Sequence, residues 1–315
     1  MSTAHAPARD RDTQPLSLQQ GVQVAAAEAA SLAQERAGVR VRVLDQVTEL
    51  QLASELFAAI WGRSGDAVPP VTPDLLRALS YAGNYVAAAF DPAGEMQGAL
   101  VGFIGGPRGD AHLHSHILGV APSSQVRGAG FALKLHQRAW ALQNGYDEVG
   151  WTFDPLVRRN AYFNLSKLGA ELDSYLVNFY GAMDDAQNQL GESDRILVRW
   201  NLLSERAASA AGGTDSDPLS QRPPTSVRIL AMGGSKQPEM SALNGATSAL
   251  VETPEDIVRM RSEAPHLATA WRLALREKLQ EVLAAGYRCA GVSRQGEYVF
   301  QRELDRPRNR NEGGT

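Results

Sequence analysis

Stretches of alternating hydrophobic and polar residues are separated by stretches with helical spacing over residues 39–202. In "VRVRVLDQ", valines alternate with arginines, which predicts a half-buried strand. The next stretch, "VTELQLASELFAAIW", predicts a helix whose buried stripe consists of Leu50, Leu52, Leu56 and Ile60. "TPDLLRALSYAG" then predicts a second helix, with Thr72 as its N-cap and Gly83 as its stop.

Three extended stretches follow, namely "NYVAAAFD", "MQGALVGFIGG" and "HLHSHILGVAP". The links between them are short and contain "PAGE" and "GPRGD", so we predict that neighbouring strands pair as antiparallel hairpins. A helix to about residue 144, the strand "DEVGWTFD", a helix over 157–168 and two more strands come next. The predicted order is β-α-α-β-β-β-α-β-α-β-β, which is an α/β fold with a mixed sheet.

Composition predicts how the rest of the chain is organised. Residues 1–38 are rich in Ala, Gln and charge; a helix over about 16–36 has no evident partner, so we expect a flexible N-terminal arm. Residues 204–226 combine Ala, Gly, Ser and Pro, as linkers do. For residues 227–303 we predict a small α/β C-terminal extension, made of a strand, a helix with a Thr-Pro start and a terminal hairpin. For residues 304–315 we predict a disordered tail.

The overall composition excludes several classes of protein. Of 315 residues, 43% are hydrophobic and 21% are charged, and the net charge of −4 gives no basic field for nucleic acid. The single cysteine, Cys289, rules out an internal disulfide and favours a cytoplasmic location. No Cys or His spacing predicts a metal site. The apolar runs are shorter than the roughly 20 residues of a membrane span, and the N-terminus does not resemble a secretory signal.

Two glycines stand one residue apart at the start of the helix in "SSQVRGAGFALKLHQRAW". The G-x-x-x-x-G-K-[ST] string of a P-loop is absent. A dinucleotide-binding loop would need a third glycine where Leu133 stands, although Asp154 lies suitably at a strand end downstream. That loop follows the first strand of a parallel sheet, whereas three hairpin-linked strands precede this one. A dinucleotide site is therefore disfavoured.

The string Gln125-Val126-Arg127-Gly128-Ala129-Gly130 matches the Q/R-x-x-G-x-G/A motif, follows a strand and opens a helix. On this motif and the order of elements around it, residues 39–202 resemble the GCN5-related N-acetyltransferases. Within that family, they resemble a bacterial branch of predicted acetyltransferases, on the strings "WTFDPLVRRNAYFNLSKLGAEL", "NFYGAM" and "DRILVRW". The resemblance implies a mostly antiparallel central sheet flanked by helices. It also implies acetyl-CoA, or another acyl-CoA, as cofactor, with its pyrophosphate held by backbone N–H groups from Val126 to Phe131.

The family also keeps the acyl thioester in a gap where the fourth strand separates from the fifth. The resemblance then implies that the cofactor is lined by Leu118, Gly119 and Val120, with a β-bulge favoured at Gly119. Further contacts would come from Asn160, Phe163 and Asn164 of the next helix, although Asn160 could equally be a helix-start residue. The family's tyrosine acid, which protonates the leaving thiolate, corresponds to Leu165, so the acid is in doubt.

Acetyl transfer needs a base for the amine proton. His114 falls where some relatives carry a general-base glutamate; His116 shares its face, and a water chain is the main rival. Asp154 and Arg159 follow the fifth strand and could hold an acceptor's ammonium and carboxylate, while Asp154 could instead cap the next helix. The C-terminal extension could cover the acceptor site, pack on the sheet or form a homodimer contact.

We therefore expect a cytoplasmic acyl-CoA-dependent N-acyltransferase that acts on a small amine or amino-acid-like acceptor, without metal, nucleic acid or membrane. The resemblance implies direct transfer in a ternary complex. The alternative is an acyl-CoA-binding sensor without turnover, which the residue at position 165 favours.

Overall fold

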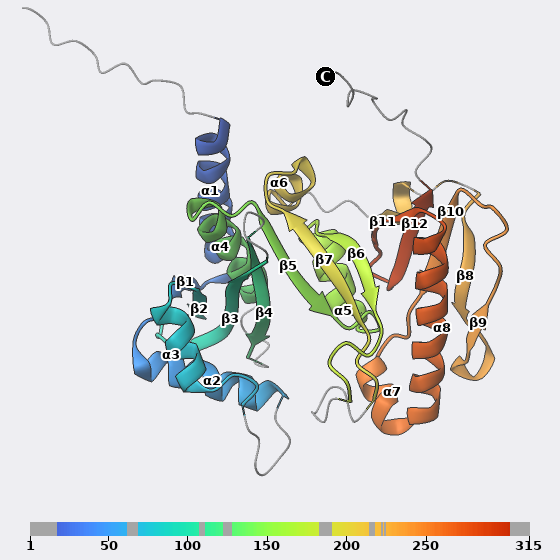
Figure 1. The fold of residues 1–315 in the computed structure, drawn as a ribbon, viewed down its shortest axis with the longest axis horizontal. Helices are drawn as coiled ribbons and strands as arrows, with labels where there is room; N and C mark the ends of the chain where they lie inside the picture. The colour runs from blue at the N-terminus through green and yellow to red at the C-terminus, as the bar shows by residue number, and fades with distance from the viewer. Residues whose placement is uncertain are drawn as a thin grey trace, which may run out of the picture.

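The computed structural model describes residues 18–61, 69–106, 111–121, 128–182, 191–213, 218–221, 223 and 225–302. Two β-sheets lie side by side, with helices against each (Figure 1). The first sheet has the order β1-β2-β3-β4-β5-β7-β6. Its strands are β1 (Arg40–Val43), β2 (Tyr85–Phe90), β3 (Met96–Gly105), β4 (His112–Val120), β5 (Glu148–Phe153), β6 (Glu171–Leu176) and β7 (Arg195–Asn201).

All pairs in this sheet are antiparallel except β4 with β5, which run parallel. One hydrophobic cluster joins the sheet to α2 (Val47–Trp61) and α3 (Pro73–Tyr81). A second cluster lies against α1 (Leu18–Ala37), α4 (Ala129–Gln143), α5 (Arg158–Ala161) and the π-helix η1 (Tyr162–Lys167). The mixed, mostly antiparallel sheet flanked by helices confirms the predicted fold class.

Local signals account for where the helices start and end. Thr72 accepts a hydrogen bond from Leu75 N at 3.4 Å, and Pro73 occupies the first turn of α3 as predicted. The expected stripe of α2 is rotated, because the helix buries Leu50, Ala53, Ser54 and Phe57 and leaves Leu52 exposed.

The N-terminal helix is not a loose arm, and this part of the prediction is wrong. Ala26, Ala30 and Ala33 of α1 are buried against α4. Gln34 accepts a hydrogen bond from Val41 N at 2.6 Å, and Gln23 donates one to Leu142 O at 2.8 Å. Alanines allow two helices to approach closely, so a face with no large hydrophobic residue still packs.

Part of the predicted linker is also folded. It contains α6 (Glu205–Ala211), capped by Ser204 and packed against α1 through small side chains, and the 3-10 turn η2 (Pro218–Gln221). Arg206 donates hydrogen bonds to Leu165 O and to Ala290 O, so α6 connects both halves of the molecule. The weakly hydrophobic composition indicated a linker because alanine burial leaves little pattern in a sequence.

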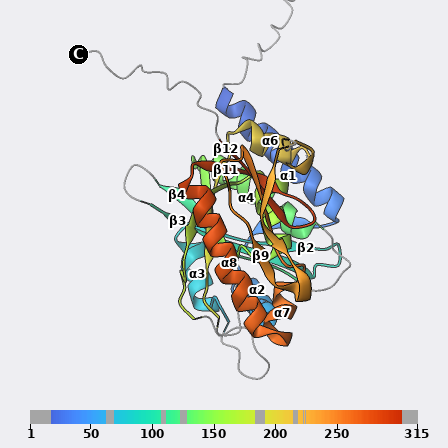
Figure 2. The ribbon, with the colours of Figure 1, turned by 90° about the vertical axis from the view of Figure 1, so that its right-hand side faces the viewer.

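The second sheet has the order β11-β12-β10-β8-β9, with β8 and β10 parallel. Its strands are β8 (Val227–Met232), β9 (Pro238–Met240), β10 (Ser248–Glu252), β11 (Tyr287–Val292) and β12 (Glu297–Arg302), with the 3-10 turn η3 (Gly234–Lys236) before β9. The helices are α7 (Ile257–Glu263) and α8 (Pro265–Ala284), and Figure 2 shows α8 running across this unit. The sequence predicted β8, α8 and the hairpin but missed β9 and β10.

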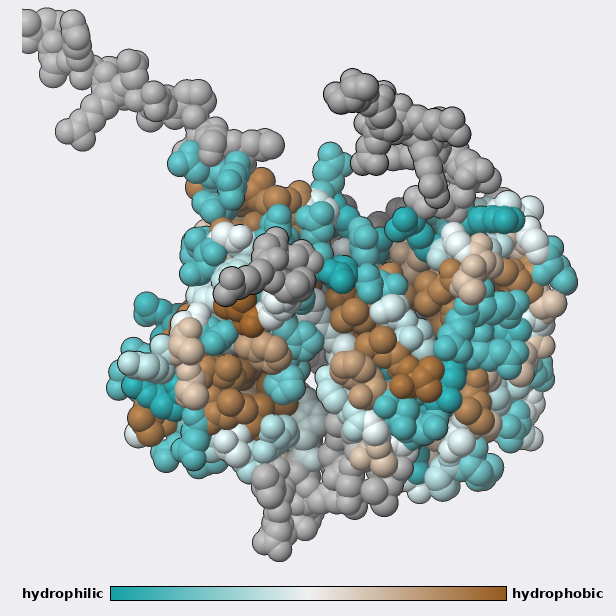
Figure 3. Space-filling view, in the orientation of Figure 1, coloured by the Kyte–Doolittle hydropathy of each residue, from teal (hydrophilic) through white to brown (hydrophobic). Residues whose placement is uncertain are grey.

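The Thr-Pro start predicted for this region is not a helix cap. Thr253 Oγ1 instead donates to Gly296 O at 2.8 Å, and Asp256 caps α7 by accepting from Arg259 N. The hydrophobic cluster of α1 and α4 continues into α8 and the second sheet, so the two sheets share one core. On the face shown in Figure 3, hydrophobic patches are interrupted by hydrophilic residues. No described helix has the length and apolar character needed to cross a bilayer.

Candidate functional site

The strands β4 and β5 form a fork. They pair only through Leu113 with Val149 and His114 with Gly150, and the two strands then run apart (Figure 1). Parallel strands that separate leave backbone N–H and C=O groups without a ladder partner, and an extended ligand can pair with these groups. The backbone separation that the resemblance implied between the fourth and fifth strands is therefore present.

The β-bulge lies at His116 rather than at Gly119. In the β3–β4 ladder, Val101 pairs with Ile117 and Gly102 with Ser115, which leaves His116 as the extra residue. A Cβ at Gly119 would lie 2.7 Å from Ile60 Cδ1, so this glycine makes room for α2. The expected bulge at Gly119 is therefore wrong.

Two glycines stand at the start of helix α4, and a different physical reason favours glycine at each position. Gly128 is the N-cap, and its φ of 101° is a backbone conformation that favours glycine. Gly130 has ordinary space around it, because an added Cβ would lie 3.4 Å from Val120 Cγ2 and 3.8 Å from Leu118 Cδ2. Packing alone does not require glycine there, which favours a ligand as the reason. Gln125, Val126 and Arg127 lie outside the described residues.

The first turn of α4 offers an anion site. The N–H groups of Ala129, Gly130 and Phe131 have no carbonyl to bond within the helix, and the helix dipole favours negative charge at this end. The C-terminus of α1 lies beside it, because a Cβ at Gly128 would be 3.4 Å from Ala37 Cβ. The residues present therefore fit a phosphate group.

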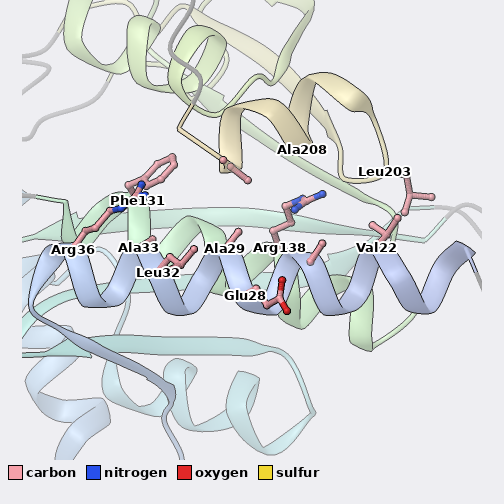
Figure 4. A pocket seen from close by; sticks show the side chains of 13 residues that line it. Val22, Glu28, Ala29, Leu32, Ala33, Arg36, Phe131, Arg138, Leu203 and Ala208 are labelled. Carbon is pink, nitrogen blue, oxygen red and sulfur yellow. The ribbon is translucent and has the colours of Figure 1, made fainter. Parts of the chain in front are cut away.

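A groove of about 320 Å³ runs from this helix start along α1, α4 and α6. Figure 4 shows Phe131 and Arg36 together at one end and Leu203 with Val22 at the other. The Lys167 ammonium lies 5.0 Å from the centre of the Phe131 ring, so two basic groups flank an aromatic ring near the start of α4. Sequence analysis did not find this groove, since one wall is the helix taken for an arm.

His112, His114 and His116 lie beside the fork, and the rings of His114 and Phe103 have centroids 5.0 Å apart. Burial, with the neighbouring charges of His116, His112 and Lys134, lowers the pKa of His114 to about 4. Burial also lowers the pKa of His116. His114 is therefore neutral at physiological pH, but it is a weaker base than an exposed histidine.

Helix α4 places a second polar cluster at the fork, on the helix side of the sheet. Lys134 Nζ donates to Ser115 Oγ at 2.8 Å and to Gln137 Oε1 at 3.1 Å. The same Nζ lies 3.7 Å from the centre of the Trp151 ring. A lysine between two leucines, with a glutamine three positions later, was the available signal, and sequence analysis missed it.

Asp154 is buried among arginine side chains, which disfavours the acceptor-binding role that the sequence predicted. The side chain is 8% exposed, and its Oδ2 lies 2.5 Å from Arg261 Nη2, 3.2 Å from Arg272 Nη2 and 3.9 Å from Arg195 Nη1. Burial would raise the pKa of this carboxyl, but the three arginines hold it below its usual value. Its Oδ1 accepts from Leu156 N at 3.0 Å, as in the turn that was the alternative. Asp154 joins the two sheets.

The helix after β5 carries the remaining candidates. Asn160 and Phe163 are half-buried, Asn164 is buried, and Arg159 is exposed. Leu165 is 1% exposed and belongs to the hydrophobic cluster, so the position of the family's acid carries no polar group. The π-helical turn around it changes which residues face the sheet relative to a regular α-helix. Within the described residues, no three metal-ligating side chains come together.

Comparisons with known proteins gave matches among solved structures alone; no family model matches the chain, and no curated protein matches its sequence. One match is a chain of the NatC complex bound to Gag peptide and CoA, with 20% identity and a TM-score of 0.38 over 52% of this chain and 98% of that chain. An N-acetyltransferase from Staphylococcus aureus Mu50 matches with 16% identity and a TM-score of 0.41, over 52% and 98%. A GNAT superfamily phosphinothricin acetyltransferase from Sinorhizobium meliloti, in complex with AcCoA, matches with 15% identity and a TM-score of 0.41, over 51% and 87%.

Proposed function

We propose that this protein is an acyl-CoA-dependent N-acyltransferase of the GCN5-related family that uses acetyl-CoA. One observation carries the proposal: the fork between β4 and β5 opens beside a helix whose first-turn N–H groups have no carbonyl partner within the helix and whose N-cap is a left-handed glycine. The fork suits an extended amide-containing chain, and the helix start suits a diphosphate. A ligand with both parts is an acyl-CoA.

The residues around the helix start extend this assignment. Backbone groups of Gly128 to Phe131 would hold the diphosphate, while those of Leu118 to Val120 would pair with the amide-bearing arm. Arg36 and the Phe131 ring would hold the phosphorylated adenosine, because a guanidinium suits phosphate and an aromatic ring stacks on a base. Asn160, Phe163 and Asn164, on the helix after β5, would contact the arm from the other side.

We assign a small amine or amino-acid-like molecule as acceptor, with direct transfer from the thioester in a ternary complex. His114, whose pKa is lowered to about 4, carries no positive charge at neutral pH that would repel an ammonium. Arg159 is exposed on the helix after β5 and is the candidate for an acceptor carboxylate. The acetyl group supplies the electrophilic carbonyl, and the protein supplies orientation and a path for the amine proton.

The test measures release of free coenzyme A thiol from acetyl-CoA with a panel of small amines and amino acids. We expect acceptor-dependent release with at least one of these amines. A second function, a sensor that binds acyl-CoA without turnover, is favoured by the buried leucine at position 165. Tight acetyl-CoA binding with no thiol release across the panel would support the sensor, and absence of binding would refute both functions.

A further inference from the structure

Lys134 reaches the point where β4 and β5 separate. The last paired residues are His114 and Gly150, so Ser115 and Trp151 are the first residues beyond the pairing. Lys134 Nζ contacts both of them, at 2.8 Å from Ser115 Oγ and 3.7 Å from the Trp151 ring centre. The amine therefore lies at the apex of the fork, where the proposed thioester would end.

The cluster is buried and lacks a carboxylate. Lys134 is 2% exposed, and its partners among the described residues are Ser115, Gln137 and the Trp151 ring, none of them charged. Its partners, Ser115 and Gln137, are also buried and are uncharged. A permanent ammonium in such a place is costly, and burial lowers the pKa of Lys134 well below its usual value.

The arrangement is that of an activated hydroxyl. A serine lies within hydrogen-bond reach of a buried lysine amine whose pKa is lowered, and a third group, Gln137 Oε1 at 3.1 Å, orients that amine. Gln137 is held in turn between α4 and β3, because a Cβ at Gly102 would lie 3.2 Å from its Nε2.

His114 is less suited to accept the amine proton. General bases work best when their pKa lies near the working pH, and that of His114 is about 4. Burial brings the pKa of Lys134 closer to the working pH, because it lowers that pKa from its usual value well above neutrality. The two groups lie close enough to interact, because a charge on Lys134 would lower the pKa of His114.

We propose that Ser115 and Lys134 together carry the proton of the transfer reaction, an inference that rests on the proposed function. As the amine nitrogen bonds to the acyl carbon, its proton passes to Ser115 Oγ while the serine proton passes to Lys134 Nζ. As the carbon–sulfur bond breaks, the Lys134 ammonium gives that proton to the departing thiolate. Bonds and protons balance without a further reactant, and the step supplies the acid that Leu165 cannot.

The first experiment observes the free protein. Protonation of Lys134 places a positive charge against the Trp151 ring and should change its fluorescence as pH is lowered. We expect a transition that disappears in Lys134→Met and in Trp151→Phe. The control is Lys278→Met, because Lys278 is also a buried lysine but pairs with Glu281 in α8. A transition unchanged in Lys134→Met would overturn the proposal.

The second experiment measures thiol release with an active acceptor. Lys134→Met should lower kcat by about 10²–10⁴-fold and remove the pH dependence of kcat, while acetyl-CoA binding stays within a few fold. Ser115→Ala should lower kcat in the same direction. A Lys134→Met rate close to wild type would overturn this inference and leave the proposed function intact. Wild type without turnover on any amine would refute the transferase and this inference with it.

Discussion

Replacing Asp154 with asparagine keeps the size of the side chain but removes the carboxylate that faces three arginines between the two sheets. Arg195 begins β7, whereas Arg261 and Arg272 come from α7 and α8. Asparagine can still accept from Leu156 N through its side-chain oxygen, so the local turn should persist. The substitution therefore isolates the charge.

The expected loss follows from burial. Removing one partner of a buried ion pair destabilises a protein by about 3–5 kcal/mol, because the opposite charges remain buried without compensation. Asp154 and its three arginines each have about 8% of their side chains exposed, so solvent screens them little. Taking about 3 kcal/mol and an m-value near 3 kcal/mol per M, the urea midpoint should fall by about 1 M.

The assay is urea unfolding followed by circular dichroism. The control is Asp173→Asn, because Asp173 pairs with Arg199 on the surface, where side chains are 34% and 47% exposed. Such a pair is worth about 0–1 kcal/mol, so the control midpoint should move by less than about 0.3 M. Equal midpoints for the two variants would refute the structural role of Asp154. An unchanged midpoint with a raised KM for the amine would restore its role in acceptor binding.

Three further predictions concern packing and pH. Gly119→Val should lower stability by about 1–3 kcal/mol in urea unfolding, because its Cβ would lie 2.7 Å from Ile60 Cδ1; an unchanged midpoint would exclude this contact. Ala30→Glu should lower stability by at least about 2 kcal/mol, since it buries a charge between α1 and α4, and a loose N-terminal arm would give no effect. The pKa of His114 is about 4 when folded against 6.5 when unfolded, so its contribution to stability is full above pH 6.5 and declines as pH falls toward 4. Between pH 6.5 and 4, the free energy of unfolding should fall by about 1–2 kcal/mol less in His114→Gln than in the wild type; this figure is reduced because the imidazole is partly exposed and solvent screens it. An identical pH profile of stability in the two proteins would contradict the lowered pKa.

The first sheet was predictable because its signals are local. Short links between extended stretches indicate hairpins, and the β2–β3–β4 order confirms this. Caps and glycines mark helix ends within one turn of sequence, as Thr72 and Gly83 do for α3. The parallel β4–β5 contact, which creates the fork, was expected from the resemblance rather than from periodicity.

The remaining features depend on contacts between distant segments. Asp154 follows a strand like many ligand-binding residues, but its partners Arg261 and Arg272 lie more than a hundred positions away. Gly119 looks like a site for a ligand, yet its neighbour is α2. From the sequence, Lys134 looks like a surface residue of an amphipathic helix. In the structure α1 covers the other side of α4, so the polar side chain of Lys134 lies inside the protein. A sequence pattern shows which residues are polar but not which element covers them.

The most direct test of the account is calorimetric titration of acetyl-CoA into the wild type and into Gly128→Asp. An aspartate at the N-terminus of α4 suits the helix dipole and tolerates a positive φ better than most residues, so the fold should persist. The control is Gly145→Asp, at the opposite end of the same helix with a φ of 81° and open space around it. We predict binding to the wild type and to Gly145→Asp, and affinity at least about tenfold weaker in Gly128→Asp because the carboxylate repels the diphosphate. Equal affinity in all three proteins would contradict the proposed acyl-CoA site.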